Sequence, residues 1–102
     1  MILIVGDWRD GDISAFNKAE EQLINTQKLH AIYGTADIIN PIKLFELMPF
    51  LSEKEELDLL LFMLKMCDKI YAVKSWENNN DARLLHDYAD VNGYKIIYSK
   101  KF

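Results

Sequence analysis

Short apolar runs alternate with amphipathic stretches along the whole chain. Ile2–Val5 is a continuous apolar run that Gly6 and Asp7 end, which is the pattern of a strand buried on both faces of a parallel sheet. Comparable runs predict three more strands, at Asp37–Ile39, Ile70–Val73 and Lys95–Tyr98.

The stretches between these runs have helical periodicity. We expect Ser14 to cap a first helix that continues to about Leu29 or Tyr33, where Gly34 can end it. Ile42–Met48 predicts a turn or two of helix. Asn40 precedes a proline and should therefore stay extended or turn.

Two further helices follow. Ser52 and Glu55 have the spacing of a capping box, and the stretch behind them is apolar nearly all round. Such a helix needs cover on more than one side, so we expect a homo-oligomer through the 52–67 helix, with simple burial as the alternative. Asn80 or Asp81 can cap the last helix, which Gly93 ends.

The alternating order predicts one α/β domain over residues 1–102, a flavodoxin- or Rossmann-like three-layer sandwich. Right-handed crossovers give a short parallel sheet of about four strands in the order 2-1-3-4. In such a sheet a crevice opens where the connections diverge, at the carboxyl ends of strands 1 and 3. The loops Gly6–Asp12 and Lys74–Asp81 are therefore the expected ligand site.

Composition narrows the function classes. The formal net charge of −4 argues against a nucleic-acid polymer as partner. His30 and His86 stand in no ligand cluster, so no metal or cofactor is expected, and a structural or surface role for His86 is favoured over a catalytic one. The single cysteine, Cys67, is expected to pack in the core. The apolar stretches are too short to span a bilayer, and we expect a cytoplasmic protein without a membrane partner.

The first loop contains candidate ligand contacts. Gly6 lets the backbone turn or approach a ligand closely, Trp8 could stack on a base, and Arg9 could bind a phosphate. Asp7 lies between them. The alternative is a solvated turn in which Trp8 covers the sheet edge and Arg9 pairs with an aspartate.

The second loop adds a second tryptophan. Trp76 could stack on a ligand or cover the core. The asparagines could bind sugar hydroxyls or build the turn, and the helix start could bind an anion. The candidates in this loop and the helix start behind it are Trp76, Asn78, Asn79, Asn80, Asp81, Ala82 and Arg83. Asn40, which follows the second predicted strand, is a further candidate.

Several short motifs in order resemble the nucleoside 2-deoxyribosyltransferase-like superfamily, most closely its small, often phage-encoded branch of uncharacterised domains. They are Ile4-Val5-Gly6, Ala15-Phe16-Asn17, Ile39-Asn40-Pro41, Cys67-Asp68-Lys69-Ile70-Tyr71, Trp76-Glu77 and Ala82-Arg83. The resemblance covers nearly the whole chain, with an insertion near 25–36. It implies cleavage or transfer at the N-glycosidic bond of nucleosides or nucleotides.

The resemblance also implies two catalytic carboxylates, and both are missing. The family aspartate falls on Leu60 and the family nucleophile, a glutamate, on Leu85. A leucine can neither attack a sugar carbon nor hold a proton. Asp58 and Asp87 are displaced by two residues, about 200° around a helix.

We therefore expect a non-catalytic protein that sequesters a nucleotide or ADP-ribose-like ligand, with a role against host nucleotide-signal immunity if it is phage-encoded. Trp8 and Trp76 would stack, Arg9 and Arg83 would bind phosphate, and residues 78–80 would bind hydroxyls. One alternative is an N-glycosidase or deoxyribosyltransferase that uses other acids. Another is a protein-interaction module with the apolar Leu57–Met66 helix as its main surface.

Overall fold

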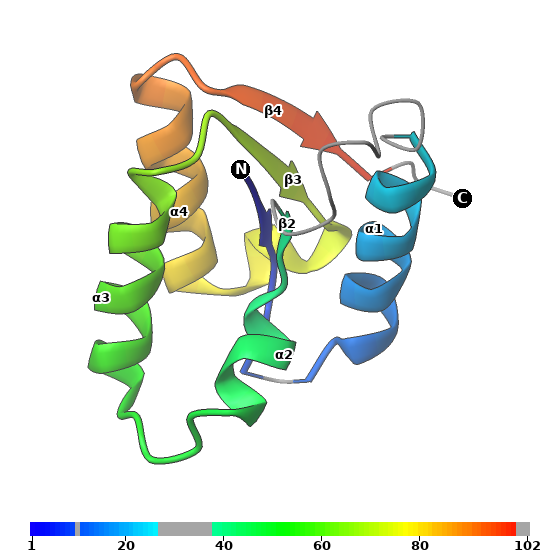
Figure 1. The fold of residues 1–102 in the computed structure, drawn as a ribbon. Coiled ribbons are helices and arrows are strands. Elements are labelled where there is room, and N and C mark those ends of the chain that lie inside the picture. The colour runs from blue at the N-terminus through cyan, green and yellow to red at the C-terminus, as the bar shows by residue number, and fades with distance from the viewer. Residues whose placement is uncertain (10, 27–37, 100–102) are drawn as a thin grey trace.

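A single parallel sheet organises the molecule (Figure 1). The computed structural model describes residues 1–9, 11–26 and 38–99. The strands are β1 (Ile2–Val5), β2 (Ile38–Ile39), β3 (Lys69–Ala72) and β4 (Lys95–Tyr98), in the order β2-β1-β3-β4. Leu3 pairs with Ile39 on one side and with Ile70 on the other. The predicted class and strand order are confirmed.

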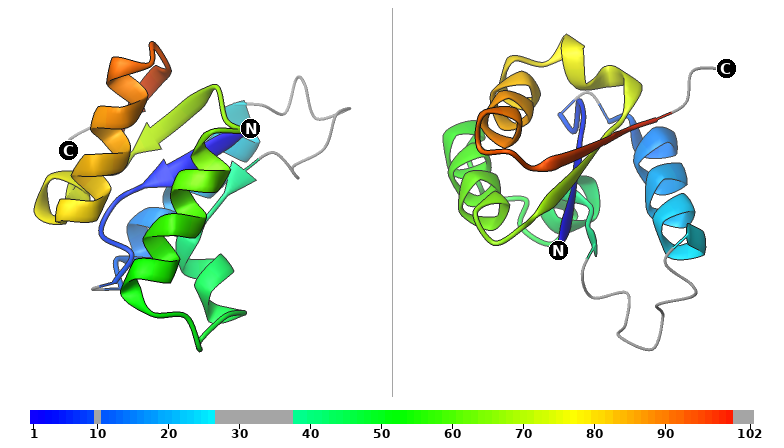
Figure 2. Two further views of the ribbon diagram at one scale, coloured as in Figure 1. Left: turned by 90° about the vertical axis from the view of Figure 1, so that its left-hand side faces the viewer. Right: turned by 90° about the horizontal axis from the view of Figure 1, so that it is seen from above.

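The helices cover both faces of this sheet. They are α1 (Ile13–Thr26), α2 (Pro41–Glu46), α3 (Glu53–Leu64) and α4 (Asn80–Val91), with a 3₁₀ helix, η3 (Lys74–Asn78), between β3 and α4. Figure 2 shows α3 and α4 on one side of the sheet and α1 on the other. This is the expected three-layer arrangement.

Side-chain caps define three of the helix starts. Ser52 and Glu55 form the predicted capping box at α3. Asn40, extended at φ −103° and ψ 105°, accepts hydrogen bonds from the first backbone amides of α2, where Pro41 fits because its missing N–H would have no partner there. For α4 the cap is Asn79 rather than Asn80 or Asp81, because the residues before it are held in η3.

The beginning of α1 differs from the expectation. Ser14 is its second residue, so the predicted cap at Ser14 is wrong. Asp12 precedes the helix, and its carbonyl accepts from the backbone amide of Phe16. The predicted continuation of this helix to Leu29 or Tyr33 lies outside the described residues.

The core forms on β1 and the inward faces of the helices. Leu3, Ile4 and Val5 are fully buried, as are Phe16 of α1, Leu60 and Leu64 of α3, and Leu85 of α4. Gly6, the first residue of the loop after β1, lies against core side chains. A Cβ at Gly6 would lie 2.1 Å from Val73 Cγ2 and 2.9 Å from Phe16 Cε1, so the glycine is needed for close packing.

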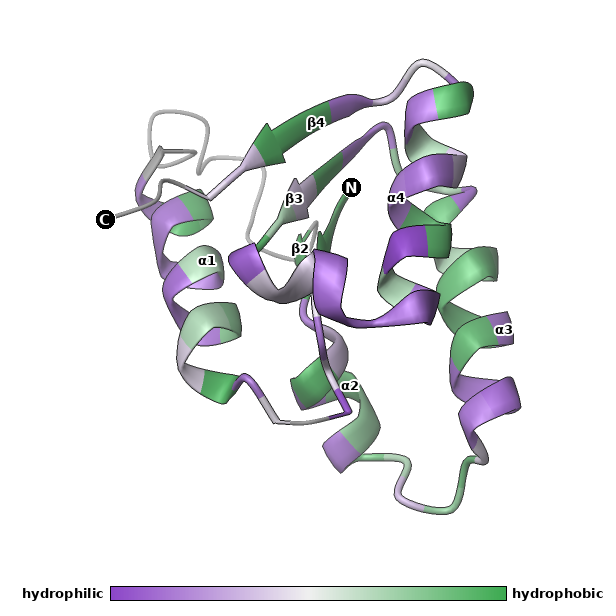
Figure 3. Ribbon diagram, turned by 180° about the vertical axis from the view of Figure 1, so that it is seen from behind, coloured by the Kyte–Doolittle hydropathy of each residue, from purple (hydrophilic) through white to green (hydrophobic). Residues whose placement is uncertain are grey.

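The outer side of α3 remains uncovered. Leu60 and Leu64 face inward, whereas Phe62 is 63% exposed. Met66, which lies two residues past the end of the helix, is 51% exposed. Figure 3 shows apolar colour along most of α3, which lies at the edge of the molecule. Burial within one copy therefore accounts for only part of its apolar surface. Among the described helices, none has both the length and the apolar character needed to cross a membrane.

Candidate functional site

The two predicted loops meet at the carboxyl ends of β1 and β3. The backbone amide of Asp7 donates to Ser75 Oγ at 3.1 Å. The Asn79 side-chain amide donates to Asp7 Oδ1 at 3.0 Å, and Arg9 donates to Asp81. The expected juxtaposition across the strand-order divergence is therefore present.

A polar crevice of about 420 Å³ lies between these loops. Apart from Glu53, every residue that lines it was a sequence-derived candidate; the lining is Asp7, Arg9, Glu53, Asn78, Asn79, Asn80 and Asp81. Glu53 was missed because it comes from the start of α3, whose approach to the first loop is a matter of tertiary packing. Three carboxylates against one guanidinium make this crevice acidic.

Arg9 is held by protein acceptors. Besides Asp81, its guanidinium reaches Glu56 Oε1 at 3.4 Å and donates to the backbone carbonyl of Glu53 at 2.8 Å. Burial lowers the pKa of Arg9. The hydrogen bond and charge of Asp81, the charge of Glu53 and the hydrogen bond to Glu56 raise this pKa by more than burial lowers it, so the net shift is upward. The guanidinium is therefore a structural cation, and a ligand phosphate would have to compete with these acceptors.

Trp8 belongs to the core. Its side chain is 6% exposed, its ring lies 6.3 Å from that of Phe45, and the Arg9 guanidinium lies 4.9 Å from its centroid. Within the described residues, its buried Nε1 has no hydrogen-bond partner. This matches the alternative interpretation of the first loop, in which Trp8 covers the sheet and Arg9 pairs with an aspartate.

Trp76 is placed differently. Its ring stacks on His86 with centroids 3.8 Å apart and an interplanar angle of 16°, and the Tyr98 ring lies 6.4 Å away. His86 is 7% exposed; its Nε2 lies 2.8 Å from the Tyr98 hydroxyl and its Nδ1 lies 3.1 Å from Asp87. The buried imidazole thus supports one face of the half-buried indole, which is the structural role expected for His86.

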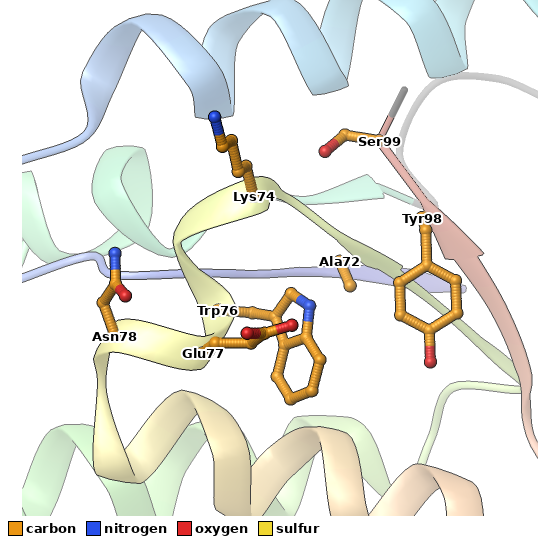
Figure 4. Close-up of a pocket in the computed structure, with 7 residues that line it drawn as sticks. All are labelled: Ala72, Lys74, Trp76, Glu77, Asn78, Tyr98 and Ser99. Carbon is orange, nitrogen blue, oxygen red and sulfur yellow. The ribbon is translucent and has the colours of Figure 1, made fainter. Parts of the chain in front are cut away.

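A second hollow of about 440 Å³ adjoins the indole. Figure 4 shows the side chains that border it, from β3, η3 and the end of β4: Ala72, Lys74, Trp76, Glu77, Asn78, Tyr98 and Ser99. Among these, Ala72, Lys74, Glu77, Tyr98 and Ser99 had not been singled out as candidates. Lys74 and Glu77 lie within the predicted loop Lys74–Asp81, whereas Tyr98 and Ser99 could have been found by extending the carboxyl-end rule from strands 1 and 3 to the edge strand. Asn78 lines both hollows.

The other sequence candidates line neither hollow. Asn40 is buried as the cap of α2, Ala82 is fully buried, and Gly6 packs against Val73. Arg83 is exposed and donates to Asn80 at 2.6 Å.

The two positions at which the resemblance leads one to expect catalytic carboxylates lie in the core. Leu60 and Leu85 are fully buried. Asp58 is exposed on α3, and Asp87 is 73% exposed and contacts His86. None of these four residues lines the crevice or the second hollow. Within the described part of the chain, no three His, Cys, Asp or Glu side chains gather as ligands for a metal ion.

The fold and site define a small parallel α/β domain with two adjoining hollows at the carboxyl ends of its strands. The model of a domain of unknown function, DUF4406, matches residues 5–98, and the chain belongs to this family. No curated protein and no solved structure was found to match the chain.

Proposed function

We propose that this domain binds a nucleotide or ADP-ribose-like small molecule at the carboxyl edge of its sheet and does not cleave it. The observation that carries the proposal is the Trp76 indole, which rests on the buried His86 ring and borders the second hollow. An aromatic ring held in this way is a preformed platform for a flat heterocycle. The hollow lies at the carboxyl ends of β3 and β4 and adjoins the crevice at the strand-order divergence, where open α/β sheets bind ligands.

The second hollow also offers groups for the rest of such a ligand. Asn78 joins it to the crevice, where amide and carboxylate groups suit sugar hydroxyls. Lys74 and Ser99 suit a phosphate better than Arg9 does, because Arg9 already donates to Asp81 and Glu56. We therefore place the phosphate of the ligand at the carboxyl ends of β3 and β4, and no longer at Arg9 in the first loop.

The proposal favours binding over cleavage because the positions where the resemblance implies the catalytic carboxylates are Leu60 and Leu85, which are apolar and fully buried. Resemblance to the nucleoside 2-deoxyribosyltransferase-like superfamily is the reason for preferring nucleotides over other flat ligands. A domain that holds such a ligand without consuming it suits sequestration of a nucleotide signal, including one used in antiviral defence.

Tryptophan fluorescence tests the binding. In a Trp8→Phe background, Trp76 is the single reporter, since the chain has two tryptophans. Titration with nucleosides, nucleoside monophosphates, ADP-ribose and cyclic ADP-ribose should give saturable quenching for at least one of them, confirmed by calorimetry on the wild type. Trp76→Leu should weaken that binding by roughly five- to 150-fold if stacking supplies about 1–3 kcal/mol. The proposal is wrong if the folded protein binds none of these compounds.

An enzymatic alternative rests on one observation, the presence of both Asp7 and Asp81 in the crevice lining. These carboxylates would have to replace the missing catalytic pair in a nucleotide N-glycosidase or deoxyribosyltransferase. Incubation with deoxynucleoside monophosphates, followed by chromatography for free base, separates the alternatives. Release of base that Asp7→Asn abolishes would establish the enzyme and overturn non-catalytic binding.

A further inference from the structure

The outer side of α3 carries an apolar stripe that the rest of the described molecule leaves uncovered. Leu59, Phe62, Met63 and Met66 are spaced at i, i+3, i+4 and i+7, so they share one side of the helical path. Phe62 and Met66 are largely exposed, and Leu59 and Met63 are half-buried. Figure 2 shows α3 beside α4 in the layer that covers one face of the sheet, so the far side of α3 faces outward.

Charge is distributed asymmetrically about Phe62. Glu55 and Asp58 precede it, Lys65 follows it, and all three side chains are exposed. Asp58 lies four residues before Phe62 and Lys65 lies three residues after it. A half-turn about an axis near Phe62 therefore places an acidic position over a basic one. The surface is complementary to a rotated copy of itself, which is the requirement for a two-fold symmetric interface.

We propose that the α3 stripe binds a second copy of this chain, with the two α3 helices antiparallel. Phe62 meets its own counterpart near the axis, and Asp58 faces the partner's Lys65 on both sides of it. Because Phe62 lies near the end of α3, the two helices overlap over their carboxyl-terminal turns, and the acidic first turn with Glu53 and Glu55 lies beyond the end of the other helix.

The size of the surface predicts a weak dimer. A helix of 12 residues is about 18 Å long, which is short for an interface that buries the roughly 1,200–2,000 Å² of stable complexes. Leu47 and Phe50, each 79% exposed, lie on the connection that leads into the other end of α3 and are not counted in this surface. We therefore expect dissociation at micromolar concentrations.

Sedimentation velocity over a range of concentrations tests the pairing on the full chain. The wild type should shift from monomer to dimer, and Phe62→Glu should remain monomeric. Val91→Glu is the matched control, because Val91 is 85% exposed on α4 and outside the stripe. Circular dichroism establishes that each variant is folded. A wild type that stays monomeric at hundreds of micromolar, or equal loss of dimer in both variants, overturns the proposal.

Charge reversal distinguishes an antiparallel second copy from non-specific association. Asp58→Lys should weaken the dimer by about three- to tenfold, since each interface holds two such pairs of modest strength. The double variant Asp58→Lys with Lys65→Asp should recover the wild-type dissociation constant. If the double variant is no tighter than the single one, the antiparallel arrangement is wrong. None of these variants touches the Trp76 hollow, so the result is independent of ligand binding.

Discussion

The Arg9 guanidinium donates to the Asp81 carboxylate and thereby joins the loop after β1 to the first turn of α4. The side chains of Arg9 and Asp81 are 20% and 27% exposed, so this pair is partly buried. Its position between the two loops means that the crevice is shaped by an ion pair of the protein itself.

Arg9→Ala should lower the free energy of unfolding by about 1–3 kcal/mol, because it leaves a partly buried carboxylate without its partner. Arg9→Lys should recover only part of this, since an ammonium cannot reproduce the forked geometry. Arg83→Ala is the control, because Arg83 is exposed and donates to Asn80 beside it. Urea denaturation measures all three. Equal effects of the Arg9 and Arg83 substitutions would contradict a structural role for Arg9.

The end of β1 gives a second prediction. Gly6→Ala should destabilise the fold by about 1–3 kcal/mol or more, because the added methyl group would overlap Val73 and Phe16 in a packed core. Gly11 has a positive φ of 74° but open space around its Cα. Gly11→Ala should therefore cost only about 1 kcal/mol, from backbone strain. The melting temperatures of the two variants then show whether glycine matters more where there is no room for a Cβ, at Gly6, or where φ is positive, at Gly11. A smaller loss for Gly6→Ala than for Gly11→Ala would refute this assignment.

The sequence was informative where local patterns determine structure. Ile2–Val5 and Lys95–Tyr98 form strands within their predicted bounds, and the capping box at Ser52 is present. The strand order followed from the handedness of the crossovers. Local pattern also placed the two loops of the crevice correctly.

Tertiary contacts determined the rest of the site. Trp8 and Trp76 are both aromatic residues in loops, but one lies in the core and the other stacks on His86. No spacing rule distinguishes them, because the difference depends on which helix packs behind each loop. For the same reason Glu53 was missed and Arg9 was expected to be available to a ligand.

Two neighbouring asparagines are predicted to have different roles. Asn79 caps α4 through the backbone amides of Asp81 and Ala82 and also donates to Asp7. Asn79→Ala should therefore cost about 1–2 kcal/mol of stability. Asn78 is exposed and lines both hollows, so Asn78→Ala should leave stability within about 0.5 kcal/mol and weaken ligand binding instead. Chemical denaturation and calorimetry measure the two effects. A destabilising Asn78→Ala would contradict this division.

The capping box predicts a pH dependence. Hydrogen bonds from the Ser52 backbone amide, and then its side chain, lower the pKa of Glu55 below its ordinary value of 4.5. A lowered carboxyl pKa gives stability that is present above the unfolded-state pKa and is lost as pH falls through the folded-state pKa. The contribution of Glu55 should thus be complete at pH 6, begin to fall near the ordinary carboxyl pKa and disappear only when the pH is below the lowered folded-state pKa. Unfolding midpoints of the wild type and Glu55→Gln should differ at pH 6 and converge in acid. A constant difference would contradict the assignment.

Cys67 should be unreactive in the folded protein. Its side chain is 6% exposed, its Sγ lies 3.4 Å from the Met63 carbonyl oxygen, and burial raises the pKa of the thiol. Both effects suppress the thiolate, the form that reacts with disulfide reagents. Because the pKa of the thiol is higher in the folded chain than in the unfolded chain, the stability of the fold at neutral pH is unaffected by ionisation of this thiol. The stability falls only as pH rises past the pKa of an exposed thiol, where the unfolded chain gains a thiolate. A disulfide reagent at pH 7.5 should therefore label Cys67 only as fast as the chain opens, and at the rate of a free thiol in denaturant. Rapid labelling of the folded wild type would show that the end of α3 opens readily. Phe62→Glu provides a further comparison, because it alters the exposed side of the same helix and should leave the labelling rate of the monomer unchanged.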